Sequence, residues 1–388
     1  MVELSPEQVA GLMDGVVRPA DGRAEAYLPS PCVQNHAANL AFLPDGTLTC
    51  LWFGGTMEGM GDISIYLSRL APGSDTWSAP EKLSDNAEKS EQNPLLFVAP
   101  DGKVWLLYTS QTAGNQDGSI VMARVSDNGG VSFGPVFVLC DLPGTFVRQP
   151  ITVNGAGQWL LPVFRCVGIP GQRWTGDADT AGVLISDDAG AHWRMTDVPN
   201  SIGAVHMNIV PLNGSNMAAF YRHRFSEAVQ RSTSDDDGRS WSAPEATNLP
   251  NNNSSVQAIH LRDGRLAMVY NHSNAAMSSD RRTSLYDEIE GEAETAPTVA
   301  SSGRKAIWGV PRAPLSLAFS SDGGVSFGGR IDLETGSGYC LTNNSKDGLN
   351  REFSYPSIIE GPDGALHIAF TYFRRAIKYV RLAPAKGF

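Results

Sequence analysis

A glycine-centred turn between two apolar runs occurs six times along the 388-residue chain. Asp-Gly and Asn-Gly turns favour tight β-hairpins, because glycine and asparagine tolerate the positive φ that such turns require. The flanking runs, such as Val104–Tyr108 and Leu366–Phe370, are predicted to be strands. The turn glycines lie 56, 55, 57, 50 and 100 residues apart, so the chain is predicted to repeat one small β unit. The turns are Leu43–Leu48, Ala99–Val104, Asn154–Trp159, Leu212–Met217, Leu261–Leu266 and Gly361–Leu366.

A second turn, with the pattern Ser-x-Asp-x-Gly-x-x-aromatic, follows several of these hairpins. Its Asp can accept backbone N–H bonds within the turn, its Gly supplies the unusual φ, and its aromatic ring can fill the space between neighbouring sheets. We interpret these turns as structural. The copies are Ser126–Phe133, with Asn128 at the Asp position, Ser186–Trp193, Ser234–Trp241, Ser320–Phe327 and a degenerate Ala71–Trp77.

Six copies of a four-stranded unit of roughly 40 to 50 residues predict an all-β fold, a six-bladed β-propeller that forms a single domain over residues 1–388. The last copy, Ser354–Leu382, has no aspartate turn. An N-terminal strand near Ala24–Leu28 is therefore expected to complete its sheet and close the ring. The doubled last interval indicates an insertion at about residues 273–311, which includes the acidic run Asp287–Glu294. We interpret it as a solvated surface loop, with a lid beside the propeller mouth as the alternative.

The charge balance restricts the partners of the chain. Its 41 acidic and 30 basic residues give a formal net charge of −11, which argues against nucleic acids and anionic membranes as partners. No run approaches the roughly 18 apolar residues of a membrane helix. The start, Met1–Gln8, lacks the features of a signal peptide, so the localisation stays open, with the cytoplasm expected if nothing precedes this start.

Neither the cysteines nor the histidines have the spacing of a metal site. The five cysteines are widely separated with no CxxC pair, so we expect buried free thiols. The seven histidines form no HxxxH pattern. We expect no metal and no cofactor.

The aspartate turns on six units resemble the Asp-box (BNR) repeats of the sialidase superfamily, from about Gln34 to Leu382. The phrases Trp52–Glu58 and Glu352–Ile358 also look like a divergent, sialidase-like branch of it. The resemblance implies an exo-glycosidase that cleaves a terminal, acidic sugar from a glycan. Hydrolases, lyases and non-enzymatic binding proteins all carry such boxes. A polysaccharide lyase acting by β-elimination at a uronic acid and a non-catalytic glycan-binding propeller therefore remain alternatives.

Of the family's catalytic positions, this chain keeps one and has a different residue at three. Tyr355 has the spacing of the family's nucleophilic Tyr before the last hairpin turn. His36 stands where the family has an Arg that grips the sugar carboxylate. Ser255 replaces the Glu that activates the Tyr, and Asn271 replaces a second Arg. A standard sialidase is therefore not expected, because a Tyr without a basic partner is a poor nucleophile at neutral pH.

Other candidates come from residue chemistry. Arginine forks suit a carboxylate or sulfate, and histidine is the natural acid or base near neutral pH. Several such side chains fall at comparable places before or after the hairpins, where a pocket or a wet central channel would lie. The expected catalytic candidates are His36 and Tyr355, with Glu58 or Asp62 as a reserve acid. The expected substrate-binding candidates are Arg148, Gln149, His206, Arg222, His223, Arg224, His272, Arg312 and Arg374.

We expect His36, Tyr355 and at least one of Arg148, Arg222 and Arg312 to converge at one mouth of the propeller. His36 is assigned as general acid or base and Tyr355 as acid or nucleophile. The arginines are assigned to the anion of an oligosaccharide or glycoside substrate.

Overall fold

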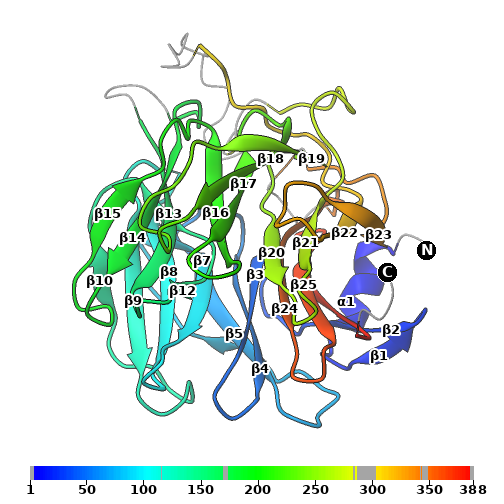
Figure 1. Ribbon diagram of the computed structural model, residues 1–388. Helices are drawn as coiled ribbons and strands as arrows, with labels where there is room; N and C mark the ends of the chain where they lie inside the picture. The colour runs from blue at the N-terminus through cyan, green and yellow to red at the C-terminus, as the bar shows by residue number, and fades with distance from the viewer. Residues whose placement is uncertain are drawn as a thin grey trace.

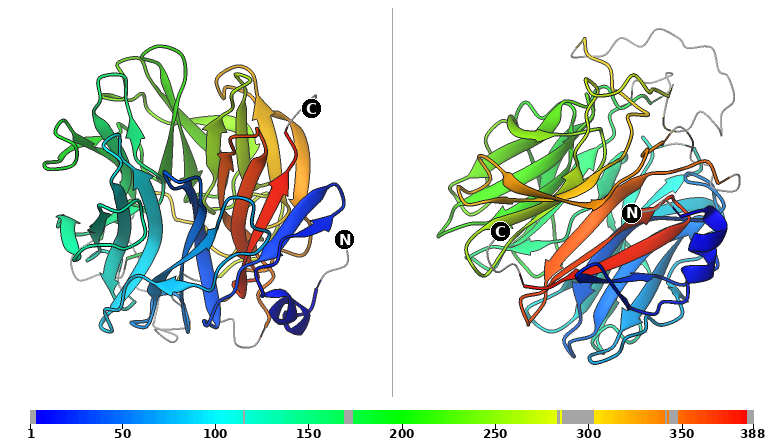
Figure 2. Two further views of the ribbon diagram at one scale, coloured as in Figure 1. Left: turned by 90° about the horizontal axis from the view of Figure 1, so that it is seen from below. Right: turned by 90° about the vertical axis from the view of Figure 1, so that its right-hand side faces the viewer.

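A computed structural model shows six antiparallel sheets arranged around a central axis (Figures 1 and 2). The structure describes residues 4–114, 116–168, 174–282, 285, 303–340, 342 and 348–384. Each sheet is one blade, and in blades 1 to 5 the strands run outward from the axis in chain order. The predicted six-bladed β-propeller is confirmed.

The first three blades follow one another along the chain, each written here from the axis outward. Blade 1 contains β3 (Gln34–Phe42), β4 (Leu48–Gly55), β5 (Ser64–Leu70) and β6 (Glu81–Lys82). Blade 2 contains β7 (Lys89–Val98), β8 (Val104–Thr112), β9 (Ile120–Ser126) and β10 (Phe137–Cys140). Blade 3 contains β11 (Thr145–Val147) and β12 (Thr152–Val153), which both pair with β13 (Trp159–Arg165), then β14 (Thr180–Ser186) and β15 (Arg194–Asp197).

Blades 4 and 5 repeat the pattern, and blade 6 joins both ends of the chain. Blade 4 contains β16 (Ala204–Pro211), β17 (Met217–His223), β18 (Ala228–Ser234) and β19 (Glu245–Pro250). Blade 5 contains β20 (Gln257–His260), β21 (Leu266–Asn271), β22 (Leu315–Ser320) and β23 (Gly328–Glu334). Blade 6 contains β24 (Phe353–Glu360), β25 (Leu366–Tyr372), β26 (Ala376–Leu382), β2 (Arg23–Tyr27) and β1 (Arg18–Ala20).

The ring closes through β2. This strand pairs antiparallel with β26, with Glu25 opposite Val380, so the start and the end of the chain share one sheet. A short helix, α1 (Pro6–Leu12), precedes β1 and begins with a capping box between Ser5 and Gln8. Figure 2 shows this N-terminal segment along the outside of blade 6.

The aspartate turns join neighbouring blades. In the copy on blade 4, Ser234 Oγ accepts from the amide of Gly238 at 2.9 Å, and Asp236 Oδ1 accepts from the amide of Ser240 at 2.9 Å. Gly238 has φ +82°, and a Cβ atom there would lie 2.4 Å from Leu160 of blade 3. The turn therefore requires glycine for both its dihedral angle and the close approach of the next blade.

Four innermost strands carry a β-bulge at the same position. The register with the second strand shifts between His36 and Asn39, and at the equivalent place in blades 2, 4 and 6. The first bulged residue has a positive φ, which is uncommon for any residue other than glycine and is typical of functional sites. These residues are Ala37 (+64°), Asn93 (+51°), His206 (+56°) and Tyr355 (+50°).

The flanks of the insertion pack against the end of the propeller where the innermost strands begin, which we call the mouth. Leu285 and Trp308 are buried in one cluster with Phe164 and Trp174 from blade 3. The amide of Ile307 donates to the carbonyl of Arg224 at 2.8 Å. The acidic run at 287–294 lies outside the described residues, so its predicted exposure stays a prediction.

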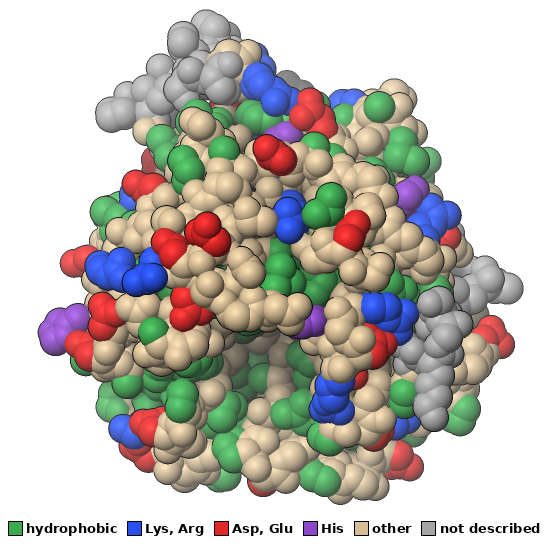
Figure 3. Space-filling model, in the orientation of Figure 1, with side chains coloured by type: hydrophobic (Ala, Val, Ile, Leu, Met, Phe, Trp, Pro, Cys, Tyr) green, Lys and Arg blue, Asp and Glu red, His purple; other side chains and the backbone are tan. Residues whose placement is uncertain are grey.

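All five cysteines are free, as expected, and only Cys140 is not fully buried. No helix in the described part of the chain is long and apolar enough to cross a membrane. Figure 3 shows acidic and basic side chains interspersed over one face, with a hollow in its lower half bordered by hydrophobic side chains.

Candidate active site

Tyr355 lies on the bulge of β24, the innermost strand of blade 6. Its side chain is 7% exposed. The ring centroid of His36, from blade 1, lies 4.2 Å from that of Tyr355, and the ring centroid of His206, from blade 4, lies 5.4 Å away. The structure thus brings together two of the predicted catalytic residues and one predicted substrate-binding residue.

Three arginines surround the Tyr355 ring. The guanidinium carbons of Arg148, Arg222 and Arg312 lie 5.3, 5.6 and 5.5 Å from its centroid, within the range of a cation–π contact. Arg222 also donates from Nη1 to the Tyr355 hydroxyl in a short hydrogen bond. Tyr355 therefore sits in a positively charged environment that suits an anionic ligand.

Arg222 has a free donor at this position. Its Nε donates to Asn253 Oδ1 at 2.6 Å, whereas Nη2 is buried without a hydrogen-bond partner among the described residues. Burial, together with the charges of Arg224 and Arg312, lowers the pKa of Arg222 to about 9. An anion beside Nη2 would satisfy the donor and offset the unfavourable charge.

Arg148 uses its donors within the protein. Its Nη1 and Nη2 donate to the carbonyl of Ala38 at 3.1 Å, and Nη2 also donates to the carbonyls of Tyr355 and Pro356. Its Nε donates to Ser255 at 3.3 Å. Arg148 therefore holds the inner strands of blades 1 and 6 together beneath the site. The neighbouring Gln149 similarly bonds protein groups of blade 5.

Glu352 is the functional candidate that sequence reasoning missed. It is fully buried, and its Oε1 lies 3.2 Å from both Arg312 Nη1 and Arg374 Nε. Arg374 Nη1 also donates to Glu58 at 2.6 Å. Burial would raise the pKa of Glu352, but Arg374, Arg312 and His36 together hold it well below its usual value. The Glu352 Oε2 atom has no hydrogen-bond partner among the described residues.

His36 and His206 are neutral side chains with open nitrogens. His36 Nδ1 lies 2.8 Å from Thr371 Oγ1 and 3.7 Å from Glu352, while its Nε2 has no partner among the described residues. The same holds for Nδ1 of His206. Burial, followed by the surrounding arginine charges, lowers the pKa of both residues well below 6.5. Each imidazole is therefore uncharged at neutral pH and has one ring nitrogen open to a ligand.

Arg224 is held in an aromatic and acidic cage. Its Nε and Nη2 donate to Asp179 Oδ2 at 3.0 and 2.7 Å. Its guanidinium carbon lies 5.4 Å from the ring of Trp174 and 5.1 Å from that of Trp308. Arg224 thus anchors the insertion at the mouth, and no sequence pattern indicated Asp179 as its partner.

The remaining predicted residues make other contacts. Asp62 is exposed and accepts hydrogen bonds from the amide and hydroxyl of Thr56. His272 contacts the Tyr270 hydroxyl at 2.8 Å, with Arg330 and Asp332 of the outermost strand of blade 5 as its charged neighbours. His223 faces Glu227 at 3.6 Å, and burial lowers its pKa to about 4.

The described residues contain no group of three or more His, Cys, Asp or Glu side chains that could hold a metal ion. The site instead offers a tyrosine, neutral imidazoles and a free guanidinium donor from blades 1, 4 and 6. This arrangement can bind an anion and transfer protons. The fold and the site together define an Asp-box propeller with a polar mouth.

The chain belongs to the BNR repeat-like domain family, whose profile matches residues 46–368. No curated protein matches the sequence. Among solved structures, the Hadza microbial sialidase Hz136 is similar, with a TM-score of 0.65 and 13% identity over 91% of this chain and 66% of that one. The chain thus spans about two thirds of that sialidase.

Two further structures share the fold. A protein of unknown function from Dyadobacter fermentans has a TM-score of 0.65 and 13% identity over 95% of this chain and 97% of that one. The NanB sialidase from Streptococcus pneumoniae, in complex with 2-[(3-chlorobenzyl)ammonio]ethanesulfonate, has a TM-score of 0.62 and 14% identity over 91% of this chain and 68% of that one. The chain therefore has a divergent sialidase-like fold.

Proposed function

We propose that this protein is a glycoside hydrolase that removes a terminal, acidic sugar from a glycan. The observation that carries the proposal is the position of Arg222. One of its terminal nitrogens donates to the Tyr355 hydroxyl, and the other is buried and free. A sugar carboxylate bound at the free nitrogen would lie beside the tyrosine oxygen, as attack on an adjacent anomeric carbon requires.

Each residue then has a role in the reaction. The oxygen of Tyr355 attacks the anomeric carbon as the bond to the leaving oxygen breaks, and a neutral imidazole accepts the phenol proton. We assign this proton to His36, whose open Nε2 belongs to the ring beside Tyr355. Glu58, the predicted reserve acid, accepts a hydrogen bond from Arg374, so His36 passes the phenol proton on to the leaving oxygen. Water then attacks the anomeric carbon, its proton returns to the Tyr355 oxygen as the bond to that oxygen breaks, and the free sugar is released.

Glu352, Arg312 and Arg374 support this chemistry from beneath. Their ion pairs neutralise much of the buried charge around His36. Glu352 also accepts from the Ser354 hydroxyl at 2.6 Å, one residue before Tyr355. We assign Glu352 as a positioning residue that holds His36 and the β24 bulge.

A second function, elimination at a uronic acid, is favoured by one specific observation. Within the described part of the chain, Tyr355 hydrogen-bonds Arg222 through its hydroxyl rather than a carboxylate base. Arginine could neutralise the uronate, a histidine could remove the proton at C5, and Tyr355 could protonate the leaving oxygen. Proton removal by an imidazole requires no covalent intermediate on Tyr355.

The two functions give different products. The protein is incubated with aryl glycosides of sialic and uronic acids and with uronate-containing oligosaccharides. Hydrolysis releases the aglycone from an aryl glycoside and a reducing sugar from an oligosaccharide, whereas elimination converts an oligosaccharide into an unsaturated uronate with a new absorbance at short ultraviolet wavelengths. If neither product forms on any of these substrates, the proposed hydrolysis is wrong and the glycan-binding alternative takes its place.

A further inference from the structure

A cavity of about 430 Å³ lies between blades 1 and 2. None of the residues that line it belongs to the group around Tyr355. Its polar wall includes Ser84, Glu91 and Ser110, and its apolar wall includes Leu83 and Val136. This volume is within the usual range for small-ligand sites, which combine apolar walls with a few placed polar groups.

Glu91 is the unusual residue of this cavity. It lies on β7 and is 3% exposed, and its Oε2 atom has no hydrogen-bond partner among the described residues. Burial raises the pKa of this carboxyl group, while contacts with Ser84 and Asn86 partly oppose the rise. A buried carboxyl oxygen without a donor is costly, so a ligand that supplies one would be stabilised.

The charges around the cavity argue against an anionic ligand. Arg124 lines the wall, but it donates to the carbonyls of Leu83, Phe133 and Gly134 at 2.7 to 2.8 Å. Asp85 and Lys82, which also line the cavity, are both exposed and carry opposite charges. The cavity therefore differs from the mouth, where Arg222 keeps a free donor for an anion.

We propose that this cavity binds a neutral sugar residue, with one sugar hydroxyl donating to Oε2 of Glu91. The hydroxyl group of Ser110 can serve another sugar hydroxyl, and Leu83 and Val136 can pack against the apolar face of the ring. The inference is independent of the reaction proposed for Tyr355, because the two sites share no residues.

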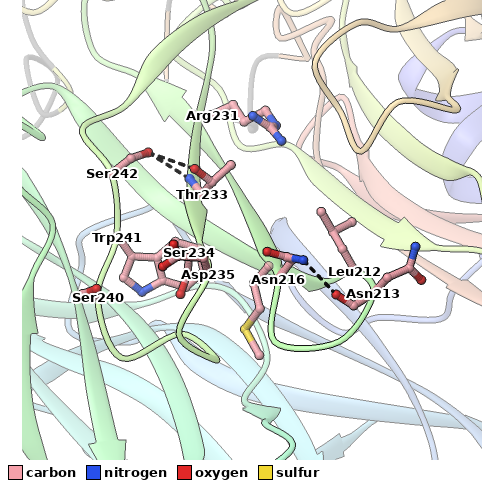
Figure 4. A pocket seen from close by; sticks show the side chains of 11 residues that line it. Leu212, Asn213, Asn216, Arg231, Thr233, Ser234, Asp235, Ser240, Trp241 and Ser242 are labelled. Carbon is pink, nitrogen blue, oxygen red and sulfur yellow. Dashed lines mark hydrogen bonds between the residues drawn. The ribbon is translucent and has the colours of Figure 1, made fainter.

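A larger cavity on blade 4 provides a contrast (Figure 4). It has a volume of about 630 Å³, but its polar groups bond one another. Ser242 contacts Thr233, and the amide of Asn216 donates to the carbonyl of Asn213. Its carboxylate Asp235 is exposed. Asp235→Asn is therefore a matched control for changes at Glu91.

The test measures binding of methyl β-galactopyranoside, methyl α-glucopyranoside and methyl α-mannopyranoside by saturation-transfer NMR and calorimetry. Glucosamine and calcium chloride test an amine and a cation at the same site. We expect at least one neutral glycoside to bind the unaltered protein. Glu91→Ala should weaken that binding about tenfold or more, by loss of a hydrogen bond to a charged or buried group.

Val136→Trp tests the same cavity independently, in case the Glu91→Ala variant does not fold. Val136 is 50% exposed, so a larger side chain there fills the cavity without entering the core. It should abolish binding, whereas Asp235→Asn and Tyr355→Phe should leave binding within about twofold. The proposal is overturned if no neutral glycoside binds, if only glucosamine or calcium binds, if Val136→Trp still binds normally, or if Tyr355→Phe removes the binding.

Discussion

The Nη1 atom of Arg222, at the end of β17 in blade 4, donates a hydrogen bond to the Tyr355 hydroxyl of blade 6. This bond joins two blades that are separated by blade 5, and it couples the predicted anion-binding group to the predicted nucleophile. The consequences of separating the two can be measured.

Tyr355→Phe removes the hydroxyl and keeps the ring between His36 and His206. Turnover should fall by at least about 100-fold, the usual scale for a lost acid, base or nucleophile. The aromatic contacts remain, but Arg222 Nη1 loses its acceptor, so the free energy of unfolding should fall by about 1 to 3 kcal/mol. A rate within tenfold of the unaltered protein would exclude the assigned role.

Arg222→Lys keeps the charge but removes the planar fork. A lysine cannot bond the Tyr355 oxygen and an anion with two fixed donors, so KM for an acidic substrate should rise about tenfold or more. Steady-state kinetics would measure this rise. The matched control, Arg239→Lys, changes an exposed arginine and should leave KM unaltered; equal effects in both variants would contradict the prediction.

Glu352→Gln removes a buried negative charge shared by Arg312 and Arg374. Breaking a buried ion pair costs about 3 to 5 kcal/mol, so the free energy of unfolding should fall by about that amount. Urea denaturation measures the change. Asp363→Asn breaks the exposed pair with Arg381 and should cost less than about 1 kcal/mol. The prediction fails if the two variants are equally stable.

Stability should fall as the pH drops from 7 to 5. Burial lowers the pKa of His223 and of His367 from 6.5 to about 4, so both stay neutral in the folded protein while the unfolded chain takes up protons below pH 6.5. Each histidine should therefore lower the free energy of unfolding by about 2 kcal/mol between pH 7 and pH 5. His36 and His206 shift in the same direction.

Urea unfolding at the two pH values measures this loss. The double variant His223→Gln and His367→Gln should show a smaller loss than the unaltered protein. Equal stability of the unaltered protein at pH 7 and pH 5 would contradict the prediction.

The blade count could be predicted because its signal is local. Each aspartate turn, such as Ser234–Trp241, requires a particular glycine and a particular acceptor within a few residues, and the repeat makes the pattern visible. The closing strand was also predicted, since the last copy lacked an aspartate turn. Its observed bounds, Arg23–Tyr27, differ by one residue from the predicted ones.

The contacts within the site were harder to predict from the sequence than the fold. Arg148 was predicted to bind substrate, but it donates to backbone carbonyls instead. Every residue has a backbone carbonyl, so the sequence does not indicate which ones will accept a hydrogen bond from an arginine. Glu352 precedes Tyr355 by three residues, within the segment Glu352–Ile358, which was used only for its resemblance to the sialidase-like branch. Its importance depends on Arg312 and Arg374, which the ring brings near from distant positions in the chain.

The pairing of β2 with β26 also determines when blade 6 can form during synthesis of the chain. β2 is synthesised before the strands of blades 1 to 5 and β26 after them, so blade 6 cannot assemble until all of those blades have emerged from the ribosome. Tyr355 lies in that same late blade. A nascent or truncated chain that lacks β26 can fold its earlier blades but has neither a closed ring nor a supported site, and so should remain inactive until β26 has been synthesised.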